Sequence, residues 1–305
     1  MRGTSETLKE ILTPGIRAMM LSALAFSVMS ALVKVAGERL SSVQITLVRG
    51  ALTLSLSWWA VRRAGLSPWG NDRKWLVMRG LLGFGGLHCY YYAVTHLPLA
   101  DATVIQLSNP LLVAIAAAIF LREPLRRPDV AGIALGLTGV ILVSRPTFLF
   151  GAVSPGSDLP ERALDPTALA VAVCGAVLSA SVYVVVRKLR ATEHPLVVVL
   201  QFPMLTVPLT LPLAVPVWVW PTPWEWLVLI GVGVFTQVGQ VKMTQAQHLE
   251  PAARATAVSY VQVLFAILFG LLLFGEPPTL WTLGGALSIA VGTMIVARPR
   301  AGGTS

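Results

Sequence analysis

The second half of the chain repeats the first half at a constant offset of 153 residues. The run Leu-Arg-Glu-Pro at 121–124 returns as Phe-Gly-Glu-Pro at 274–277, and Val-Ser-Arg-Pro at 143–146 returns as Val-Ala-Arg-Pro at 296–299. The same offset relates both pairs, so no gap separates them. Whatever fold the first half adopts, the second half is therefore expected to adopt as well.

The chain is too apolar for a soluble protein. Hydrophobic residues make up 55% of its 305 residues, charged residues only 12%, and the mean hydropathy is +0.73, whereas a soluble domain carries about a quarter charged residues. The net charge of +9 comes from short clusters between long apolar runs, which does not fit nucleic-acid binding. Cys89 and Cys174 lie within apolar runs and lack the spacing of a metal site or of a secreted disulfide pattern.

Ten segments are long and apolar enough to cross a membrane, which takes about 20 mostly apolar residues. They lie near 15–36, 42–61, 75–95, 99–121, 128–145, 166–187, 194–218, 223–245, 252–274 and 278–297. Five fall in each copy of the repeat, so the expected fold class is an all-α membrane protein with ten transmembrane helices in two five-helix repeats. In the seventh segment, four prolines predict a kinked or broken helix: Pro203, Pro208, Pro212 and Pro216.

The distribution of basic residues predicts how the repeats are oriented. With the N terminus in the cytoplasm, the inner segments carry 15 Lys and Arg residues and the outer segments carry four, as expected when positive charge stays inside. An odd number of spans per repeat then inverts the second repeat relative to the first. Inversion also explains why the basic loop at 122–127 loses its arginines in the copy at 275–280, because that copy lies outside.

These boundaries divide the chain into five parts. They are a cytoplasmic segment 1–14, a first repeat 15–145, an external linker 146–165, a second repeat 166–298 and a cytoplasmic tail 299–305. No cleavable signal peptide is expected, because the first residues are polar and the first apolar run is long enough to span. We expect the protein in the plasma membrane, the bacterial inner membrane, with both termini cytoplasmic.

Polar residues inside the spans indicate where the bundle has an interior, because burying them in hydrocarbon is unfavourable unless they are paired or face water. The fourth span carries a polar stripe of Thr103, Gln106 and Asn109, and the offset maps it onto Thr256, Ser259 and Gln262 of the ninth span. Spacing by three places each stripe on one helix face. The stripes predict two walls of a central cavity, or alternatively hydrogen bonding between helices.

The third span presents His88 and Tyr92 close to one face. His88 is the histidine that lies deep in a span, and three roles are open for it: a structural hydrogen bond, a ligand contact or a proton carrier. The glycines before it predict close helix packing. They do not form a dinucleotide-binding motif, since they lack both its spacing and a preceding strand.

Arg49 is the sharpest candidate for a functional residue. It sits about eight residues from the outer end of the second span, too deep to reach water easily, and no acidic residue lies at mid-membrane depth in any span. Such a charge needs an aqueous cavity, a cluster of carbonyl groups or an anionic partner, so it either contacts substrate or tethers helix ends. Arg79 lies one turn into the third span and is expected to reach the cytoplasmic face by snorkelling. Lys242 either snorkels too or joins a polar face with Gln237 and Gln240.

Pro110 follows Asn109 directly and interrupts the fourth span near its centre, where a freed carbonyl group can serve a ligand or a hinge. The equivalent residue of the ninth span is Val263, so a proline-based gate would exist in one half only. Glu123 and Glu276 are each followed by proline at a membrane surface, which favours capping and chain reversal.

The chain resembles the drug/metabolite transporter superfamily, EamA type. The resemblance rests on the five-plus-five inverted helices, Arg49-Gly50, the stretch 92–102 that leads to Asn109-Pro110, and the repeated Glu-Pro after the fourth and ninth spans. It extends over about 15–298. It implies a substrate cavity between the halves that opens alternately to each side, and export or exchange of amino acids or related metabolites. The stretch 92–102 also looks like members that take up riboflavin or S-adenosylmethionine.

The leading prediction is a secondary transporter of a small polar metabolite, an amino acid or related compound that bears a carboxylate, with export or exchange favoured. Uptake of a vitamin or nucleoside-like metabolite such as riboflavin or S-adenosylmethionine is the alternative. A non-transport structural protein that associates through Gly132 and Gly136 is more distant. No enzyme is expected, since a metal cluster, an acid pair or a nucleophile with its base is lacking.

The predicted ligands and partners follow from this function. The partners are a small-molecule substrate and the lipid bilayer, without nucleic acid, cofactor or metal, and a monomer is favoured. The candidate substrate-binding residues are Arg49, His88, Tyr92, Thr103, Gln106, Asn109, Gln237, Gln240, Ser259, Tyr260 and Gln262, with Pro110 as the gating residue.

Overall fold

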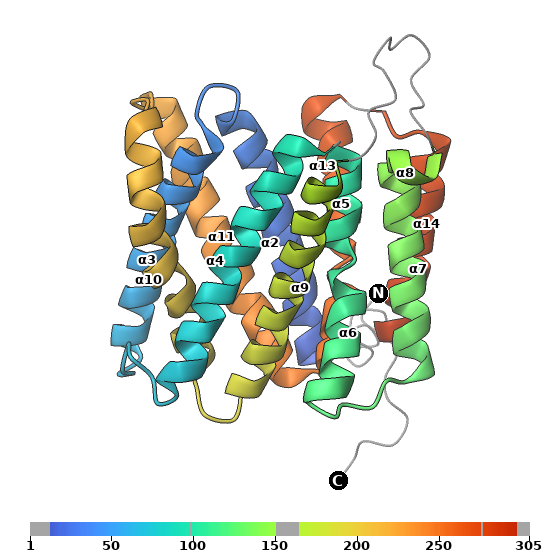
Figure 1. The fold of residues 1–305 in the computed structure, drawn as a ribbon, viewed down its shortest axis with the longest axis horizontal. Helices are drawn as coiled ribbons and strands as arrows, with labels where there is room; N and C mark the ends of the chain where they lie inside the picture. Colours follow the sequence, from blue (N-terminus) through green and yellow to red (C-terminus); the bar gives the residue numbers. More distant parts are fainter. Residues whose placement is uncertain (1–12, 98, 151–164, 276, 298–305) are drawn as a thin grey trace, which may run out of the picture.

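The structure is a computed structural model that describes residues 13–97, 99–150, 165–275 and 277–297. Regular structure in these ranges is helical throughout (Figure 1). The first half forms α2 (Pro14–Ala36), α3 (Ser42–Arg63), α4 (Arg73–His96), α5 (Leu99–Leu107), α6 (Asn109–Phe120), α7 (Arg127–Ser144) and the short α8 (Thr147–Phe150). The second half forms α9 (Pro166–Leu189), α10 (Pro195–Ala214), η1 (Val215–Val217), α11 (Pro223–Leu249), α12 (Ala252–Val258), α13 (Val261–Phe274) and α14 (Leu280–Ala297).

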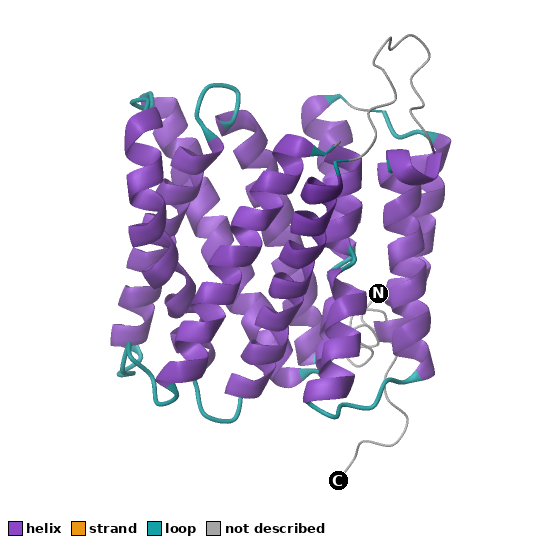
Figure 2. Cartoon of the chain, viewed as in Figure 1, coloured by secondary structure: helices purple, strands orange, loops and turns teal. Residues whose placement is uncertain are grey.

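The ten predicted spans are confirmed as ten helical crossings, because α5 with α6 and α12 with α13 each form one crossing. Eight of these segments are long and apolar enough to span a membrane by composition alone. The crossings α3 and α4 are equally long but are not among the eight; they carry Arg49 and Arg79. Figure 2 shows loops gathered at the two ends of the bundle, with a short break inside it.

Helix bounds follow the sequence repeat. α7 and α14 have 18 residues each, and both their first and last residues are one repeat offset apart. Local capping sets several of the starts: Thr13 accepts a hydrogen bond from the Ile16 backbone N–H at 3.3 Å, and Asp165 accepts one from the Thr167 N–H at 2.9 Å. Such side chains satisfy N–H groups that have no partner within the helix.

The proline-rich seventh span is not broken where its first three prolines stand. α10 stays helical through Pro203, Pro208 and Pro212, and it gives way to η1 only at Val215. Two other crossings are interrupted instead, between α5 and α6 at Ser108 and between α12 and α13 at 259–260. Pro110 predicts the first interruption, whereas the second occurs without a proline.

Equivalent helices of the two halves run antiparallel, so the repeats are inverted. A Cβ added to Gly132 would lie 2.9 Å from the Gly292 carbonyl oxygen, and one added to Gly139 would lie 2.6 Å from the Gly285 oxygen. Residue numbers thus rise along α7 as they fall along α14. The Ser288 hydroxyl donates to the Leu135 carbonyl at 2.7 Å, and these residues are 153 positions apart. Gly132 and Gly136 therefore pack inside one bundle.

The remaining contacts obey the same symmetry. α2 packs along α11, and α4 packs along α9, which is the equivalent pair. α3 packs on its own equivalent α10. We call the face where α2 begins and α14 ends the terminal face, and the opposite face, where α8 lies, the linker face. The segment 151–164, most of the predicted linker, lies outside the described residues, as do 1–12 and 298–305, while the start of that linker forms α8.

Candidate functional site

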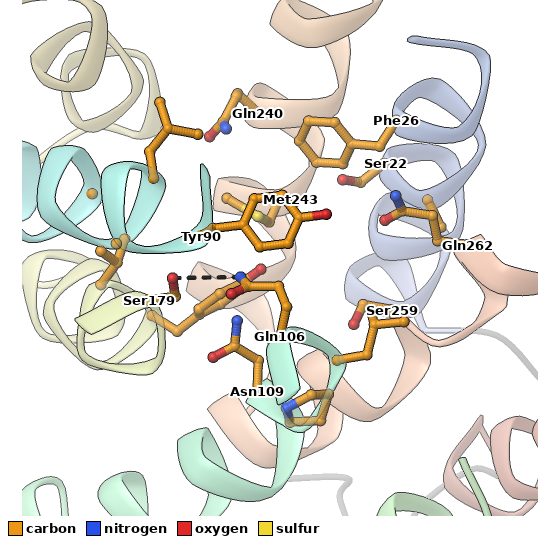
Figure 3. A pocket seen from close by; sticks show the side chains of 18 of the residues that line it. Ser22, Phe26, Tyr90, Gln106, Asn109, Ser179, Gln240, Met243, Ser259 and Gln262 are labelled. Carbon is orange, nitrogen blue, oxygen red and sulfur yellow. Dashed lines mark hydrogen bonds between the residues drawn. The ribbon is translucent and has the colours of Figure 1, made fainter. Parts of the chain in front are cut away.

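A cavity of about 480 Å³ lies between the two halves. Figure 3 shows polar and aromatic side chains from several helices pointing into it, among them Tyr90, Gln106 and Gln262. Its walls come from α2, α3, α4, the α5–α6 crossing, α9, α10, α11 and the α12–α13 crossing. Both halves contribute, so the site forms only when they pack together.

The cavity follows the repeat symmetry in position but not in chemistry. Six pairs of repeat-equivalent residues line it: Phe26 with Ser179, Arg49 with Phe202, Leu87 with Gln240, Tyr90 with Met243, Gln106 with Ser259, and Asn109 with Gln262. A site lined by equivalent positions lies on the pseudo-twofold axis that relates the repeats. In most pairs one partner is polar and the other apolar or smaller, so the two walls present different groups to a ligand.

Five of the six residues of the two polar stripes line the cavity. They are Thr103, Gln106, Asn109, Ser259 and Gln262. Thr256 is buried instead and donates its hydroxyl to the Ala252 carbonyl at 2.8 Å. Each stripe spans a helix break, at Ser108 or at 259–260, so its residues do not all lie on one face of a straight helix. Thr256 therefore need not face the cavity that the rest of its stripe lines.

Hydroxyl groups mark both interruptions. Ser108 donates to the Ile105 carbonyl at 2.6 Å, and Ser259 donates to the Thr256 carbonyl at 2.6 Å. Serine that bonds back to its own helix backbone often bends the helix. A break in the α12–α13 crossing therefore does not require the proline that the α5–α6 crossing carries, and both halves have an interrupted helix at the cavity.

Arg49 lines the cavity from α3, and its side chain is half-buried. α3 begins at the linker face with Ser42, so Arg49 lies about 10 Å along the helix from that face. Within the described residues, no carboxylate forms an ion pair with it.

Arg79 also lines the cavity, which contradicts the expectation that it reaches the cytoplasmic face. Only 2% of its surface is exposed. Its Nη2 donates to Gln240 Oε1 at 3.3 Å, and its guanidinium lies over the Phe202 ring, 4.9 Å from the centroid. Its depth alone would allow snorkelling, but its side chain contacts Phe202 of α10 and Gln240 of α11 instead of reaching the terminal face.

Of the remaining candidates, Gln240 and Pro110 line the cavity, and the other five lie outside its lining. His88 bonds to the Phe84 carbonyl at 3.0 Å and packs on the Phe84 ring. Tyr92 stacks on His96, with ring centroids 3.9 Å apart. Gln237 accepts from the Ser57 hydroxyl at 2.9 Å, and Tyr260 is buried against Gly136. Lys242 donates to Gln245 at 3.1 Å.

Several lining residues were not singled out from the sequence. They include Ser22, Tyr90, Ser179 and Tyr183. The repeat could have found Tyr90, because its equivalent Met243 lies three residues after the candidate Gln240 and so on the same helix face. In Figure 3 Ser179 accepts a long hydrogen bond of 3.5 Å from the Gln106 amide.

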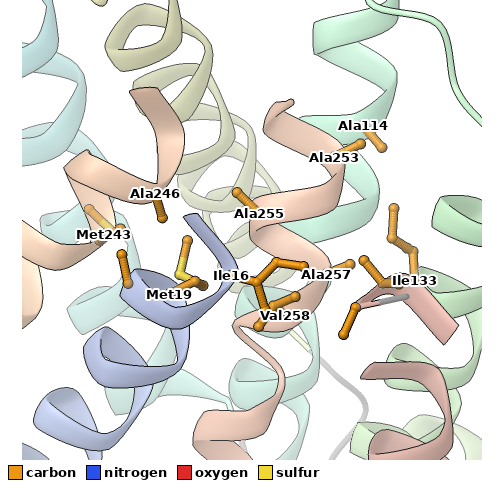
Figure 4. Close-up of a cluster of buried hydrophobic side chains, with 13 residues drawn as sticks. Ile16, Met19, Ala114, Ile133, Met243, Ala246, Ala253, Ala255, Ala257 and Val258 are labelled. Atoms are coloured by element: carbon orange, nitrogen blue, oxygen red, sulfur yellow. The ribbon is translucent and has the colours of Figure 1, made fainter. Parts of the chain in front are cut away.

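The terminal face is closed below the cavity. Every residue of α12 is buried, and α12 belongs to an apolar cluster with the start of α2 and the ends of α11 and α14 (Figure 4). The cluster consists of Ile16, Ala18, Met19, Ala114, Ile133, Met243, Ala246, Ala253, Ala255, Ala257, Val258, Val296 and Ala297.

One ion pair between the halves and one within the second half reinforce this closure. Arg187 Nε donates to Glu123 Oε1 at 2.7 Å, and Glu123 Oε2 accepts from the Ala252 backbone N–H at 2.9 Å. Glu123 thus caps α12 of the opposite half. The residues next to Glu123 in the sequence do not indicate this contact. Arg254 pairs with Glu250 at 3.0 Å, and Glu250 also accepts from Thr13. Glu276, the repeat equivalent of Glu123, lies outside the described residues.

Toward the linker face the interior remains hollow. A second cavity of about 420 Å³ shares Thr103, Leu107 and Gln262 with the central one. It continues between the crossings and the α7–α14 pair, past Ser144 and Thr282. The described arrangement is therefore packed shut at the terminal face and hollow toward the linker face.

Comparison with known proteins assigns both halves to one family. The model of the EamA-like transporter family matches residues 13–145 and again 166–298. The pseudopaline exporter CntI of Pseudomonas aeruginosa is 29% identical over 96% of this chain and 99% of its own. Solute carrier family 35 member G1 of Mus musculus is 31% identical over 96% of this chain and 81% of its own. A solved structure with 19% identity has the same fold, at a TM-score of 0.74, over 94% of this chain and 96% of the other.

Proposed function

The chain belongs to the EamA-like transporter family of membrane transporters, and we propose that it moves a small polar metabolite bearing a carboxylate across the plasma membrane. The observation that carries this proposal is the charge of the central cavity. Arg49 and Arg79 line it, and none of the described residues that line it is Asp or Glu. A cationic site in a water-poor interior favours an anionic ligand, because the ligand supplies the missing counter-charge.

Polar groups between the arginines fit a ligand that also donates hydrogen bonds. Asn109 Oδ1 is buried and has no hydrogen-bond partner among the described residues. Gln106, Ser259 and Gln262 surround the same space. An amino acid or a related metabolite carries both a carboxylate for an arginine and N–H groups for these oxygens.

Transport by alternating access follows from the inverted halves. Symmetry-related crossings interrupted at the cavity can exchange roles, so that the packing now found at the terminal face forms at the linker face instead. His88 lies outside the cavity lining, and among the residues that the structure describes no histidine or acid lines the cavity. Exchange or uniport therefore fits this site better than proton coupling, which uses a group that changes charge between states.

Three further features of the proposal concern the direction of transport, the topology and the oligomeric state. The name of the Pseudomonas relative, an exporter, supports export as the net direction. The basic residues at the terminal face, such as Arg126 and Arg190, support a cytoplasmic location for that face and for both termini. We propose a monomer, since one chain builds the whole cavity.

Counterflow into liposomes that contain the purified protein tests this function. We expect radiolabelled amino acids or other small carboxylates to exchange, and Arg49→Ala to reduce this exchange at least tenfold, because the variant lacks one counter-charge for the carboxylate. Arg62→Ala is the matched control, since Arg62 lies on the same helix but packs on Trp58, 5.2 Å from its ring centroid. Carboxylate exchange by Arg49→Ala at the rate of the parent would disprove the anionic site.

A further inference from the structure

We infer that the cavity holds a substrate with two anionic groups, one bound by Arg49 and the other by Arg79. This inference rests on the proposed function and makes it narrower: it assigns a second anion subsite to Arg79, and it names a dicarboxylate, or an amino acid with a second anionic group, as the substrate class.

Arg79 has the features of a binding group that lacks its ligand. Its side chain is almost entirely buried, and its Nε atom has no hydrogen-bond partner among the described residues. A guanidinium has five N–H donors in one plane, which match the two oxygens of a carboxylate. The groups that contact it, the Gln240 amide and the Phe202 ring, are neutral. They orient the guanidinium without neutralising it.

Neutral partners make an anionic ligand favourable at this position. A buried charge without a counter-charge is strongly unfavourable, and in proteins it is usually compensated by an ion pair with further hydrogen bonds. The three ion pairs found among the described residues lie elsewhere: at Arg39, Arg187 and Arg254. Since Arg79 lines the cavity, a ligand in the cavity can supply the missing carboxylate.

The two arginines lie at different depths, so one carboxylate cannot pair fully with both. Arg49 lies seven residues from the start of α3 at the linker face, and Arg79 lies six residues from the start of α4 at the terminal face. At about 1.5 Å per residue in helices roughly 30 Å long, the two backbone positions differ in depth by on the order of 10 Å. Arginine side chains reach across part of this distance, and a ligand with separated anionic groups covers the rest.

Repeat symmetry supports two unlike subsites. Phe202 is the equivalent of Arg49, and it contacts Arg79 from the neighbouring helix α10. The second half thus has no arginine at the position equivalent to Arg49, while the first half supplies both cations. A substrate with one anionic group would leave one of the two arginines that line the cavity without a counter-charge.

The test compares ligands that differ only in the second carboxylate. Binding to purified protein is measured by titration calorimetry for succinate, glutarate and adipate, each against the monocarboxylate with the same number of carbons: butyrate, valerate and hexanoate. We expect at least one dicarboxylate to bind tenfold or more tightly than its partner. Arg79→Gln should abolish this ratio, because it weakens dicarboxylate binding at least tenfold more than monocarboxylate binding, whereas Arg79→Lys should keep part of it. Arg62→Gln should keep all of it.

Equal binding of mono- and dicarboxylates by the unaltered protein would overturn the inference without the need for a folded variant. The same holds if Arg79→Gln weakened both ligand classes by one factor, since that result indicates a structural role. These outcomes leave the proposed function intact if Arg49→Ala still impairs exchange. If no carboxylate bound and Arg49→Ala exchanged normally, the proposed function itself would fail.

Discussion

At the scale of single residues, the charged groups of this bundle fall into two classes. Arg187 and Arg254 are buried with carboxylate partners at the terminal face, and the Arg187–Glu123 pair joins the two halves. Arg49 and Arg79 line the cavity, and within the described residues no carboxylate pairs with either of them. The presence of a partner carboxylate thus distinguishes the arginines of the closed face from the two that we propose to bind substrate.

Glu123→Gln is expected to loosen the terminal face. The variant keeps an oxygen for the Ala252 N–H but loses the charge that pairs with Arg187, whose side chain is only 7% exposed. A hydrogen bond to a charged group contributes about 1.5–3 kcal/mol. Amide hydrogen exchange in 252–258 should therefore quicken by about tenfold or more.

The matched control lies at the linker face, where Arg39 pairs with Glu225 in an exposed position. Hydrogen bonding to Glu225 raises the pKa of Arg39, so this pair is formed but remains in contact with water. Glu225→Gln should leave exchange in 252–258 unchanged, because an exposed pair contributes little. Unchanged exchange in Glu123→Gln as well would show that apolar packing alone closes the terminal face.

At the scale of helices, α7 and α14 form the closest contact between the repeats. Gly139 and Gly285 allow each backbone to touch the other, and Gly132 with Gly292 does the same further along. This packing requires the absence of side chains, since dispersion between close backbones replaces the hydrophobic effect inside a membrane. We therefore expect this pair to act as a fixed seam during transport, and the interrupted crossings next to it to move.

Two adjacent glycines of α14 test this seam. A methyl group on Gly285 would lie 2.6 Å from the Gly139 carbonyl oxygen, whereas one on Gly284 would meet nothing within 4 Å. Gly285→Ala should lower the free energy of unfolding by about 1–3 kcal/mol through overpacking. Gly284→Ala should leave it unchanged or raise it by up to about 1 kcal/mol, because alanine favours helix. Thermal unfolding in detergent measures both, and equal effects would show that the helices do not pack this closely.

At the scale of the whole molecule, inversion places repeat-equivalent loops on opposite sides of the membrane. Glu38, between α2 and α3, and Ala191, between α9 and α10, are one repeat offset apart, and both are exposed. The first lies at the linker face and the second at the terminal face.

Cysteines at these two positions test the orientation. In a background with Cys89→Ser and Cys174→Ser, a membrane-impermeant maleimide should label Glu38→Cys in intact cells. It should label Ala191→Cys only after the cells are permeabilised, because basic loops stay inside. Labelling of both from the same side would contradict the inverted topology, and exchanged labelling would place the termini outside.

Much of this architecture could be predicted from the sequence, because span length and a gapless repeat can both be identified without knowing how the helices pack. The placement of Arg79 could not be predicted, since its depth suits snorkelling. Its contacts with α10 and with Gln240 of α11 decide where its side chain points. The break after Ser259 was missed for a similar reason: no proline signals it, and the serine that bonds back to Thr256 has no distinctive sequence context. His88 is polar at mid-span, yet a carbonyl of its own helix satisfies it.

Closure at the terminal face has a kinetic consequence. A substrate that approaches from that side binds only to molecules in which α12 has separated from its neighbours, and the apparent dissociation constant there equals the intrinsic one divided by the fraction of such molecules. For a substrate that approaches from the linker side, the corresponding factor is the fraction of molecules open to that side. The strength of the Glu123–Arg187 pair therefore makes the carrier respond differently to equal concentrations on its two sides.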